Sequence, residues 1–195
     1  RRQFAIGTAE GSELLALCAR AMREADPELV VQALDARNAY GTASRAACLE
    51  ALGTAAPAVL PCARLFSQRT SQYFFWDAAG RCHQLEATSG IDQGDPLAPL
   101  LFACGLGPHL QGLEETLRGR AVANGLDPDR VRVLAYLDDI TVLRPPELAA
   151  EVPPAAQNAL RDFGLELRRD KAQAWSPRAS CPAGLEDCWR SGGLT

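Results

Sequence analysis

Basic side chains, histidines and long apolar runs are scarce in this chain, and each shortage argues against a class of protein. Its 195 residues include 20 lysines and arginines against 24 aspartates and glutamates, which gives a formal net charge of −4. A complete nucleic-acid binder normally presents basic surface to phosphates. The acidic balance therefore argues against a strong, self-sufficient nucleic-acid binder. It fits a core whose basic flanking parts belong to other segments.

Zinc-binding and membrane signals are missing as well. With two histidines, and with seven cysteines that form no Cys-x-x-Cys pair, no zinc site is visible. Several cysteines fall in apolar helical stretches, which indicates buried free thiols in a reducing compartment, while a disulfide between Cys181 and Cys188 is left open. No signal peptide begins the chain, and no apolar run approaches the ~20 residues of a membrane span. We expect a soluble intracellular segment, either nuclear or cytoplasmic.

The most informative feature present is a pair of adjacent carboxylates, Asp138 and Asp139. They lie between two apolar, β-branched runs, residues 131–135 and 140–143, which predict a tight β-hairpin that turns at the pair. Two neighbouring anions repel and give a turn no stability. A divalent cation would relieve that repulsion, since Mg²⁺ takes oxygen ligands and often only one or two carboxylates. The alternative is a solvated Asp-Asp turn, because aspartate is a common turn former.

A further carboxylate, Asp35, follows another strand-like run, residues 29–34. An aspartate at a strand end and an aspartate pair at a hairpin tip can meet at one edge of a sheet. Together they could hold two Mg²⁺ ions roughly 3.5–4 Å apart, the arrangement that clamps both reacting oxygens in phosphoryl transfer. Taken alone, Asp35 is equally well explained as a turn residue or N-cap before a helix expected over about residues 42–52.

The third element runs from Gly90 to Phe102. Asp95 followed by Pro96 predicts an N-cap and a first helical position, and Gly94 would let a ligand or another backbone approach closely. Gln93 offers an amide beside that helix start. Capping explains the Asp-Pro pair but not the Gln-Gly that precedes it.

Three segments of the chain look like palm motifs of reverse transcriptases, in the family's order: residues 34–40, 93–102 and 136–139. Residues 164–175 are similar to the motif that follows the aspartate pair. Residues 3–13 resemble the finger-to-palm junction of the non-LTR retrotransposon type. Any one of these motifs alone is a weak signal, but four in order are a strong one.

The resemblance implies an α+β fold, a polymerase palm whose antiparallel sheet packs on helices, with partial fingers and no thumb. The chain would be a single domain over residues 1–195, a fragment of a longer parent. Residues 1–28 would be the finger-to-palm junction, and residues 29–175 would carry the palm motifs. Residues 176–195 would be a loop-like end before the primer-supporting hairpin. Within this end, residues 192–195 resemble the start of that hairpin. The missing fingers and thumb segments of the parent would then be partners of this fragment.

The same resemblance implies an RNA-directed DNA polymerase, with an RNA template, a DNA primer and deoxynucleoside triphosphates as partners and Mg²⁺ or Mn²⁺ as cofactor. Asp35 and Asp138 would hold the metals, aided by the backbone carbonyl of Ala36, and Asp139 would support the cluster. Without fingers and thumb, we expect this fragment alone to be inactive. The alternative function is a non-catalytic remnant or scaffold that keeps the palm fold, which the acidic charge leaves open.

Four more residues receive roles from the resemblance. Tyr40 matches the aromatic gate that clashes with a 2′-hydroxyl, which tells against an RNA-templated RNA polymerase; from the residues alone, a core anchor explains it equally well. Gln93 would pack on the incoming nucleotide, with Gly94 giving it room. Lys171 is the one lysine of the chain. Because lysine, unlike arginine, can be tuned to give up a proton, Lys171 could protonate the departing pyrophosphate.

The remaining pattern predicts further elements. Helical spacing covers residues 13–25 and 57–68, and an aromatic β-hairpin covers residues 73–87. Its aromatic cluster could stack on bases, but a packed hairpin face is the preferred interpretation. We expect the helix after Pro96 to be interrupted at Gly107-Pro108, and a later helix to be kinked or split by Pro153-Pro154.

Overall fold

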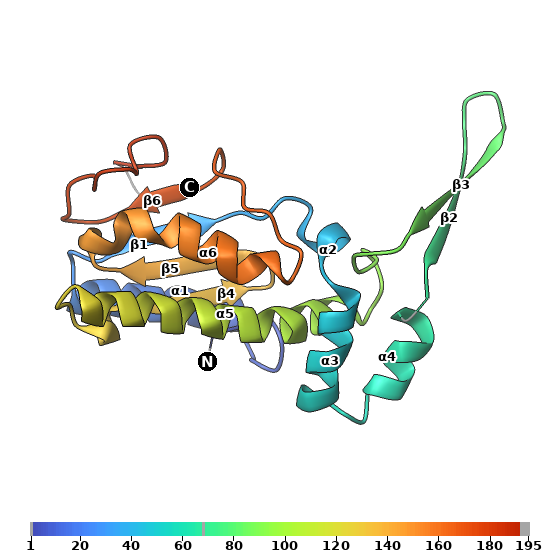
Figure 1. Cartoon of the computed structure of the whole chain (residues 1–195), viewed down its shortest axis with the longest axis horizontal. Coiled ribbons are helices and arrows are strands. Elements are labelled where there is room, and N and C mark those ends of the chain that lie inside the picture. The colour runs from blue at the N-terminus through green and yellow to red at the C-terminus, as the bar shows by residue number, and fades with distance from the viewer. Residues whose placement is uncertain (1, 68, 192–195) are drawn as a thin grey trace.

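The computed structural model describes residues 2–67 and 69–191 of the chain. At its centre is a four-stranded antiparallel sheet with the order β4-β5-β1-β6 (Figure 1). The strands are β1 (Val30–Leu34), β4 (Arg132–Tyr136), β5 (Asp139–Arg144) and β6 (Gln173–Trp175). The expected antiparallel sheet is therefore present, and the aspartate pair lies at the β4–β5 turn, as the sequence predicts.

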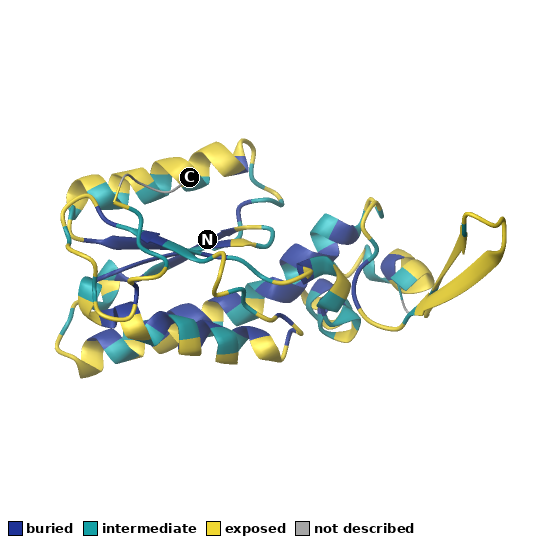
Figure 2. Ribbon diagram, turned by 90° about the horizontal axis from the view of Figure 1, so that it is seen from above, coloured by how far each residue is buried: buried dark blue, intermediate teal, exposed yellow. Residues whose placement is uncertain are grey.

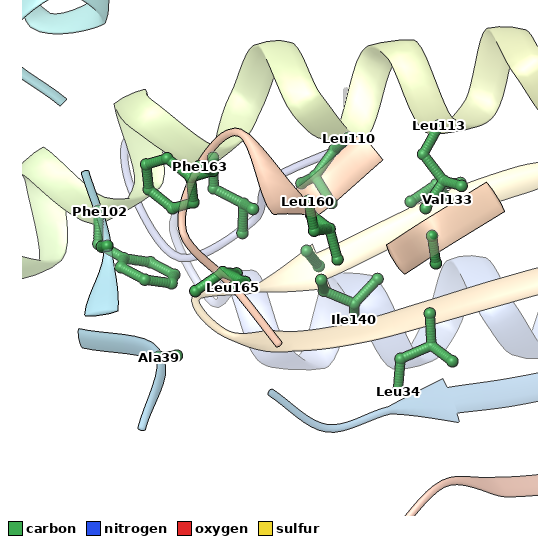
Figure 3. Packing of buried hydrophobic residues seen from close by; sticks show 14 of the residues in the cluster. Leu34, Ala39, Phe102, Leu110, Leu113, Val133, Ile140, Leu160, Phe163 and Leu165 are labelled. Atoms are coloured by element: carbon green, nitrogen blue, oxygen red, sulfur yellow. The ribbon is translucent and has the colours of Figure 1, made fainter. Parts of the chain in front are cut away.

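Helices cover both faces of this sheet. Helices α5 (Ala98–Ala123) and α6 (Val152–Arg161) lie on one face, and α1 (Gly11–Ala25) lies on the other (Figures 1 and 2). Successive strand residues point to opposite faces, so each face has its own buried cluster. The cluster under α5 and α6 includes Leu34, Val133, Ile140, Leu160 and Phe163 (Figure 3). The cluster under α1 contains Phe4, Val31, Leu134 and Leu143.

Helix α5 is continuous through Pro108, so the interruption expected at Gly107-Pro108 is wrong. A proline inside a helix removes one backbone hydrogen bond and crowds the preceding turn, at a cost of about 3 kcal/mol. Leu106 and Leu110, on either side of it, are fully buried in the main core. Fully burying a leucine contributes roughly 1.5–3 kcal/mol, so the packing of these two side chains offsets the proline.

The shorter helical elements are α2 (Ala39–Thr42), α3 (Arg45–Ala55), α4 (Leu60–Ser67) and the 3₁₀ turns η1 (Pro128–Arg130) and η2 (Pro146–Glu151). The helices expected over about residues 42–52 and 57–68 are α3 and α4, and both begin later than predicted. Helix α3 starts where it does because the Ser44 hydroxyl caps it, accepting from Ala47 N–H at 3.2 Å. Pro153 and Pro154 lie in the first turn of α6, where a missing N–H costs no helical bond. The helical stretch after Pro146 is divided into η2 and α6 just before these prolines, so the predicted split is confirmed, and the alternative of a kink inside one helix is not found.

Strands β2 (Ser71–Trp76) and β3 (Cys82–Ala87) form a separate two-stranded hairpin that projects away from the sheet (Figure 1). Phe75 stacks on His83 across the strands, with ring centroids 4.9 Å apart. The aromatic side chains on both faces of the hairpin are nevertheless exposed, namely Tyr73, Phe74, Phe75 and Trp76 (Figure 2). The packed aromatic face that we preferred from the sequence is therefore not formed.

All seven cysteines lie in the described part of the chain and are free thiols. Cys48 is buried, as expected, and burial raises the pKa of its thiol to about 12, followed by a smaller effect of Cys104. The disulfide left open between Cys181 and Cys188 is absent. Among the helices described, none combines the length and the apolar character needed to cross a membrane.

Candidate active site

The strand register brings the predicted carboxylates together at one end of the sheet. Leu34 of β1 pairs with Ile140 of β5, so the next positions, Asp35 and Asp139, are neighbours. Tyr136 pairs with Asp139 across the β4–β5 turn, which leaves Leu137 and Asp138 as the two turn residues. Leu34 and Ile140 point into the main core. By alternation, the two aspartates beside them face away from it.

The charges of these aspartates interact. Burial raises the pKa of Asp139, and the negative charges of Asp138 and Asp35 raise it further. The nearest cation to Asp35 is Arg168, whose Nε lies 4.0 Å from Asp35 Oδ2. Arg168 is held more closely by Asp170, at 2.6 Å from Nη2 to Oδ2. The cluster therefore carries negative charge that no nearby arginine neutralises fully.

Asp35 and Asp139 line an open groove of about 550 Å³. Asp170, Lys171 and Arg190 line the same groove. Lys171, which the sequence singles out as a proton donor, thus faces the same space as the two carboxylates. Asp138 lies at the tip of the turn, and Ala36 pairs with Leu167 in an isolated antiparallel bridge just past β1.

The carboxylates suit a divalent cation only when other ligands complete its shell. Within the described residues, no group of three or more His, Cys, Asp or Glu side chains converges closely enough to hold a metal ion. Mg²⁺ characteristically binds through one or two carboxylates and keeps waters or phosphate oxygens in its remaining positions. Asp35 and Asp139, with Asp138 beside them, match that donor set. They do not form a closed protein cage.

Tyr40, in α2, is anchored in the core and also lies near the carboxylates. Its ring stacks on Phe102, with centroids 4.6 Å apart and planes 14° from parallel. Phe102 in turn meets Phe163 edge to face at 5.5 Å. Burial raises the pKa of the Tyr40 hydroxyl, and the charge of Asp138 raises it further. The two interpretations of Tyr40, core anchor and gate, are thus compatible.

Gln93 lies in a different hollow from the carboxylates. This hollow, of about 400 Å³, is lined by Asn38, which is the N-cap residue of α2, by Gly41 within α2, and by Tyr73 of the hairpin. It is tied to α2 by the bond from Ile91 N–H to Tyr40 C=O, at 2.7 Å. The structure therefore places Gln93 beside the Tyr40 segment and outside the groove that holds Lys171.

Of two expectations about the segment after Gln93, one stays a prediction and one is wrong. A Cβ at Gly94 would meet no atom of the chain within 4 Å, and the φ of +97° at Gly94 already favours glycine because side chains rarely adopt it; the close approach of a ligand there stays a prediction. Helix α5 begins at Ala98, and Asp95 is not its N-cap. Asp95 instead accepts from Leu97 N–H at 2.8 Å and so stabilises the turn before the helix.

The structure also adds residues that sequence patterns missed. Arg190 reaches the groove because Trp189 bridges to Ala174 in parallel, with Arg190 N–H donating to Ala174 C=O at 2.8 Å. Gln3 binds the backbone of Leu137 at the aspartate turn. Arg190 belongs to no motif. Gln3 lies in the segment that resembles the finger-to-palm junction, but that resemblance gives it no role at the aspartate turn, because its contact with Leu137 spans 134 positions. Residues 192–195, expected to resemble the start of the primer-supporting hairpin, lie outside the described residues.

Comparisons with known proteins agree with this geometry. The family model "Reverse transcriptase (RNA-dependent DNA polymerase)" matches residues 4–183. The retrotransposable element SLACS 132 kDa protein of Trypanosoma brucei gambiense is 34% identical over 143 residues. That match covers 72% of this chain but only 11% of the relative.

Solved structures show the same fold. Telomerase from Candida albicans, in complex with a fragment of telomeric RNA, has a TM-score of 0.62 at 13% identity, covering 89% of this chain and 32% of that one. Apo telomerase from Candida tropicalis has a TM-score of 0.64 at 11% identity, and the match covers 88% of this chain and 33% of that one. At such identities the likeness shows the fold alone, and the fold is the expected palm.

Proposed function

This chain belongs to the reverse transcriptase (RNA-dependent DNA polymerase) family, and we propose that it is the catalytic palm of a retroelement-type enzyme. The reaction is template-directed transfer of a nucleotide from a deoxynucleoside triphosphate to a primer 3′-hydroxyl. One observation carries the proposal: the β1–β5 register sets Asp35 beside Asp139 in a groove that also holds Lys171. RNA template, DNA primer, and the fingers and thumb of a longer parent are its partners.

In this proposal the carboxylates of Asp35, Asp138 and Asp139 hold Mg²⁺ or Mn²⁺, with the Ala36 carbonyl as a further oxygen ligand. Bound there, the cations supply the charge neutralisation and the activated primer hydroxyl that two-metal phosphoryl transfer uses. The protein contributes positioning, since phosphoryl transfer requires little covalent chemistry from side chains. Asp35 and Asp139 have fixed positions because each adjoins a paired strand residue.

Lys171 acts as the proton donor to the leaving pyrophosphate. It lines the same groove as Asp35 and Asp139 and is exposed, so a triphosphate in the groove is accessible to it. Tyr40 acts as the sugar gate, held rigid by its stack on Phe102. Gln93, in the adjoining hollow with Asn38 and Gly41, packs on the incoming nucleotide.

Mn²⁺ titration followed by water-proton relaxation tests the site in this chain. We expect weak binding that Asp138→Asn and Asp35→Asn each reduce, because both remove a ligand oxygen charge from one cluster. Asp162→Asn is the matched control, since Asp162 is exposed at the end of α6, outside the groove. Equal binding by all four proteins would remove these carboxylates from the site. A non-catalytic scaffold that keeps the palm fold would then be the better account.

A further inference from the structure

The turn that carries Asp138 is held by a residue from outside its own hairpin. Leu137 has a left-handed backbone, with φ of 53°. Two-residue hairpin turns that need positive φ usually use glycine, asparagine or aspartate there, because a larger side chain crowds the next carbonyl. Leucine is therefore an unfavourable choice at this position, and something must compensate for it.

The side-chain amide of Gln3 satisfies both backbone groups of Leu137. Leu137 N–H donates to Gln3 Oε1 at 2.9 Å, and Gln3 Nε2 donates to the Leu137 carbonyl at 3.1 Å. A carboxamide has both functions on one rigid plane, so a single side chain can pair with both groups of one residue. These two bonds are made to the residue immediately before Asp138.

Gln3 is itself fixed against the sheet. Ala135 N–H donates to the Arg2 carbonyl at 2.7 Å, and Phe4 N–H donates to the Ala135 carbonyl at 2.9 Å. These bonds hold residues 2–4 alongside β4 as a short parallel bridge. Phe4 is 4% exposed and packs in the cluster under α1. The amide of Gln3 therefore approaches the turn from a rigid support.

A second anchor holds the same segment. Glu114 of α5 is 7% exposed and binds Arg2 Nη2 through Oε1 at 3.0 Å. Its other oxygen accepts from Val133 N–H of β4 at 2.9 Å. One buried carboxylate thus ties residues 2–4 and the start of the β4–β5 hairpin to the same helix.

We propose that Gln3 is a positioning residue that stabilises the left-handed Leu137 and thereby sets where Asp138 and Asp139 present their carboxylates. Gln3 touches no reacting atom and acts through the turn. This inference rests on the proposed function, because the placement of the carboxylates matters only if they hold the metal ions. Without Gln3, the turn relaxes toward a conformation that leucine prefers, and the aspartates separate from Asp35.

The test uses this chain with Mn²⁺ alone as the probe, together with amide hydrogen exchange. Gln3→Met keeps the length of the side chain and removes both bonds to Leu137, together with the bond that Gln3 Oε1 accepts from Ala5 N–H at 3.2 Å. We expect the Leu137 amide to lose its protection while the β4 amides keep theirs. We expect Mn²⁺ affinity to fall about 10-fold, the lower end of the loss seen when partners of metal ligands are removed. Gln111→Met, at an exposed position of α5, is the control and should change neither quantity.

A rescue separates positioning from general stability. Adding Leu137→Gly to Gln3→Met removes the conformational penalty at the turn, because glycine adopts positive φ readily. We expect the double variant to regain most of the Mn²⁺ affinity without regaining the Leu137 bond. Gln3→Leu, which also lacks both the donor and the acceptor and adds no charge near the aspartates, replaces Gln3→Met in the test if the latter does not fold.

Each alternative result has a distinct meaning. An unchanged Leu137 exchange rate in Gln3→Met would show that the two bonds are not made. Lost protection with unchanged Mn²⁺ affinity, or no rescue by Leu137→Gly, would overturn the positioning role and leave the proposed function intact. Absence of Mn²⁺ binding in the unmodified chain would overturn the proposed function, and this inference with it.

Discussion

Arg144 offers the sharpest test of the energetics of the sheet. It is the last residue of β5, is fully buried, and has no carboxylate partner in the described chain. Nη2 donates to Gln32 Oε1 at 2.8 Å and Nη1 to the Pro145 carbonyl at 3.3 Å, while Nε has no partner among the described residues. A buried charge held only by neutral acceptors is costly.

The cost can be worked from its titration. Burial lowers the pKa of Arg144 to about 10, and a lowering of that size corresponds to roughly 3 kcal/mol against the charged form. Since both the folded and unfolded chains bind this proton at pH 7, the full cost is present there. As pH rises above about 10 the folded chain releases the proton before the unfolded chain does, so the cost is lost and stability rises.

Arg144→Met keeps most of the volume and removes this charge. Removing the charge gains roughly 3 kcal/mol of stability. The variant loses two hydrogen bonds of about 1 kcal/mol each, and it leaves a buried Gln32 oxygen without its donor, which costs a further ~1–3 kcal/mol. The single variant should therefore range from neutral to about 2 kcal/mol less stable than the original chain. Adding Gln32→Leu removes the stranded oxygen, and the double variant should be more stable than the original chain by about 1 kcal/mol.

Urea unfolding at pH 7 measures the difference, with Arg161→Met as the control because Arg161 is exposed. Above about pH 10, the unmodified chain should gain stability relative to the double variant. A double variant that is clearly less stable than the original at pH 7 would refute the reasoning. It would mean that the bonds of Arg144 outweigh the cost of burying its charge.

Three further predictions concern catalysis. In a longer parent that carries this segment, Tyr40→Ala should raise the kcat/KM for ribonucleotides relative to that for deoxynucleotides, whereas Tyr40→Phe should not. Because removing a buried ring typically costs about 3–5 kcal/mol of stability, this ratio must be measured in folded protein. An unchanged ratio would contradict the role of Tyr40 as a gate. Lys171→Arg should slow single-turnover chemistry by roughly 10²-fold with similar nucleotide affinity, and equal rates would reduce Lys171 to an electrostatic role. The chain alone should bind primed RNA weakly, lose it as salt rises, and fail to extend the primer; extension at ordinary turnover, resolved by product length, would contradict this.

The parts of the fold that sequence patterns predict are those set by local alternation. Residues 29–34 and 131–143 alternate or run apolar as strands do, and the aspartate pair interrupts the second run at its turn. That is enough to place Asp35 and Asp139 at one sheet edge, as the register then shows. Local patterns fail for α5, because Gly107 and Pro108 signal a break that the buried leucines beside them override.

Contacts between distant residues account for the rest. Gln3 and Leu137 are 134 positions apart, so no local pattern links them. Gly164 is a second residue whose role depends on a contact distant in sequence. A Cβ added at Gly164 would lie 2.3 Å from the Thr42 carbonyl oxygen. Its place in a recognisable motif suggests chemistry, whereas the structure shows a close backbone approach that requires glycine. Such approaches become visible only once the elements are packed.

If the proposed function holds, the groove explains how a chain of net charge −4 would accept a polyanion. Its lining carries three acids, Asp35, Asp139 and Asp170, and two bases, Lys171 and Arg190, so its own charge is 2 − 3 = −1. A triphosphate alone would be repelled. One divalent cation at the carboxylates changes the net charge of the groove to +1, and two change it to +3. The sign of that charge therefore depends on how many cations are bound. The local arrangement of five side chains, more than the overall charge, then decides whether the substrate binds.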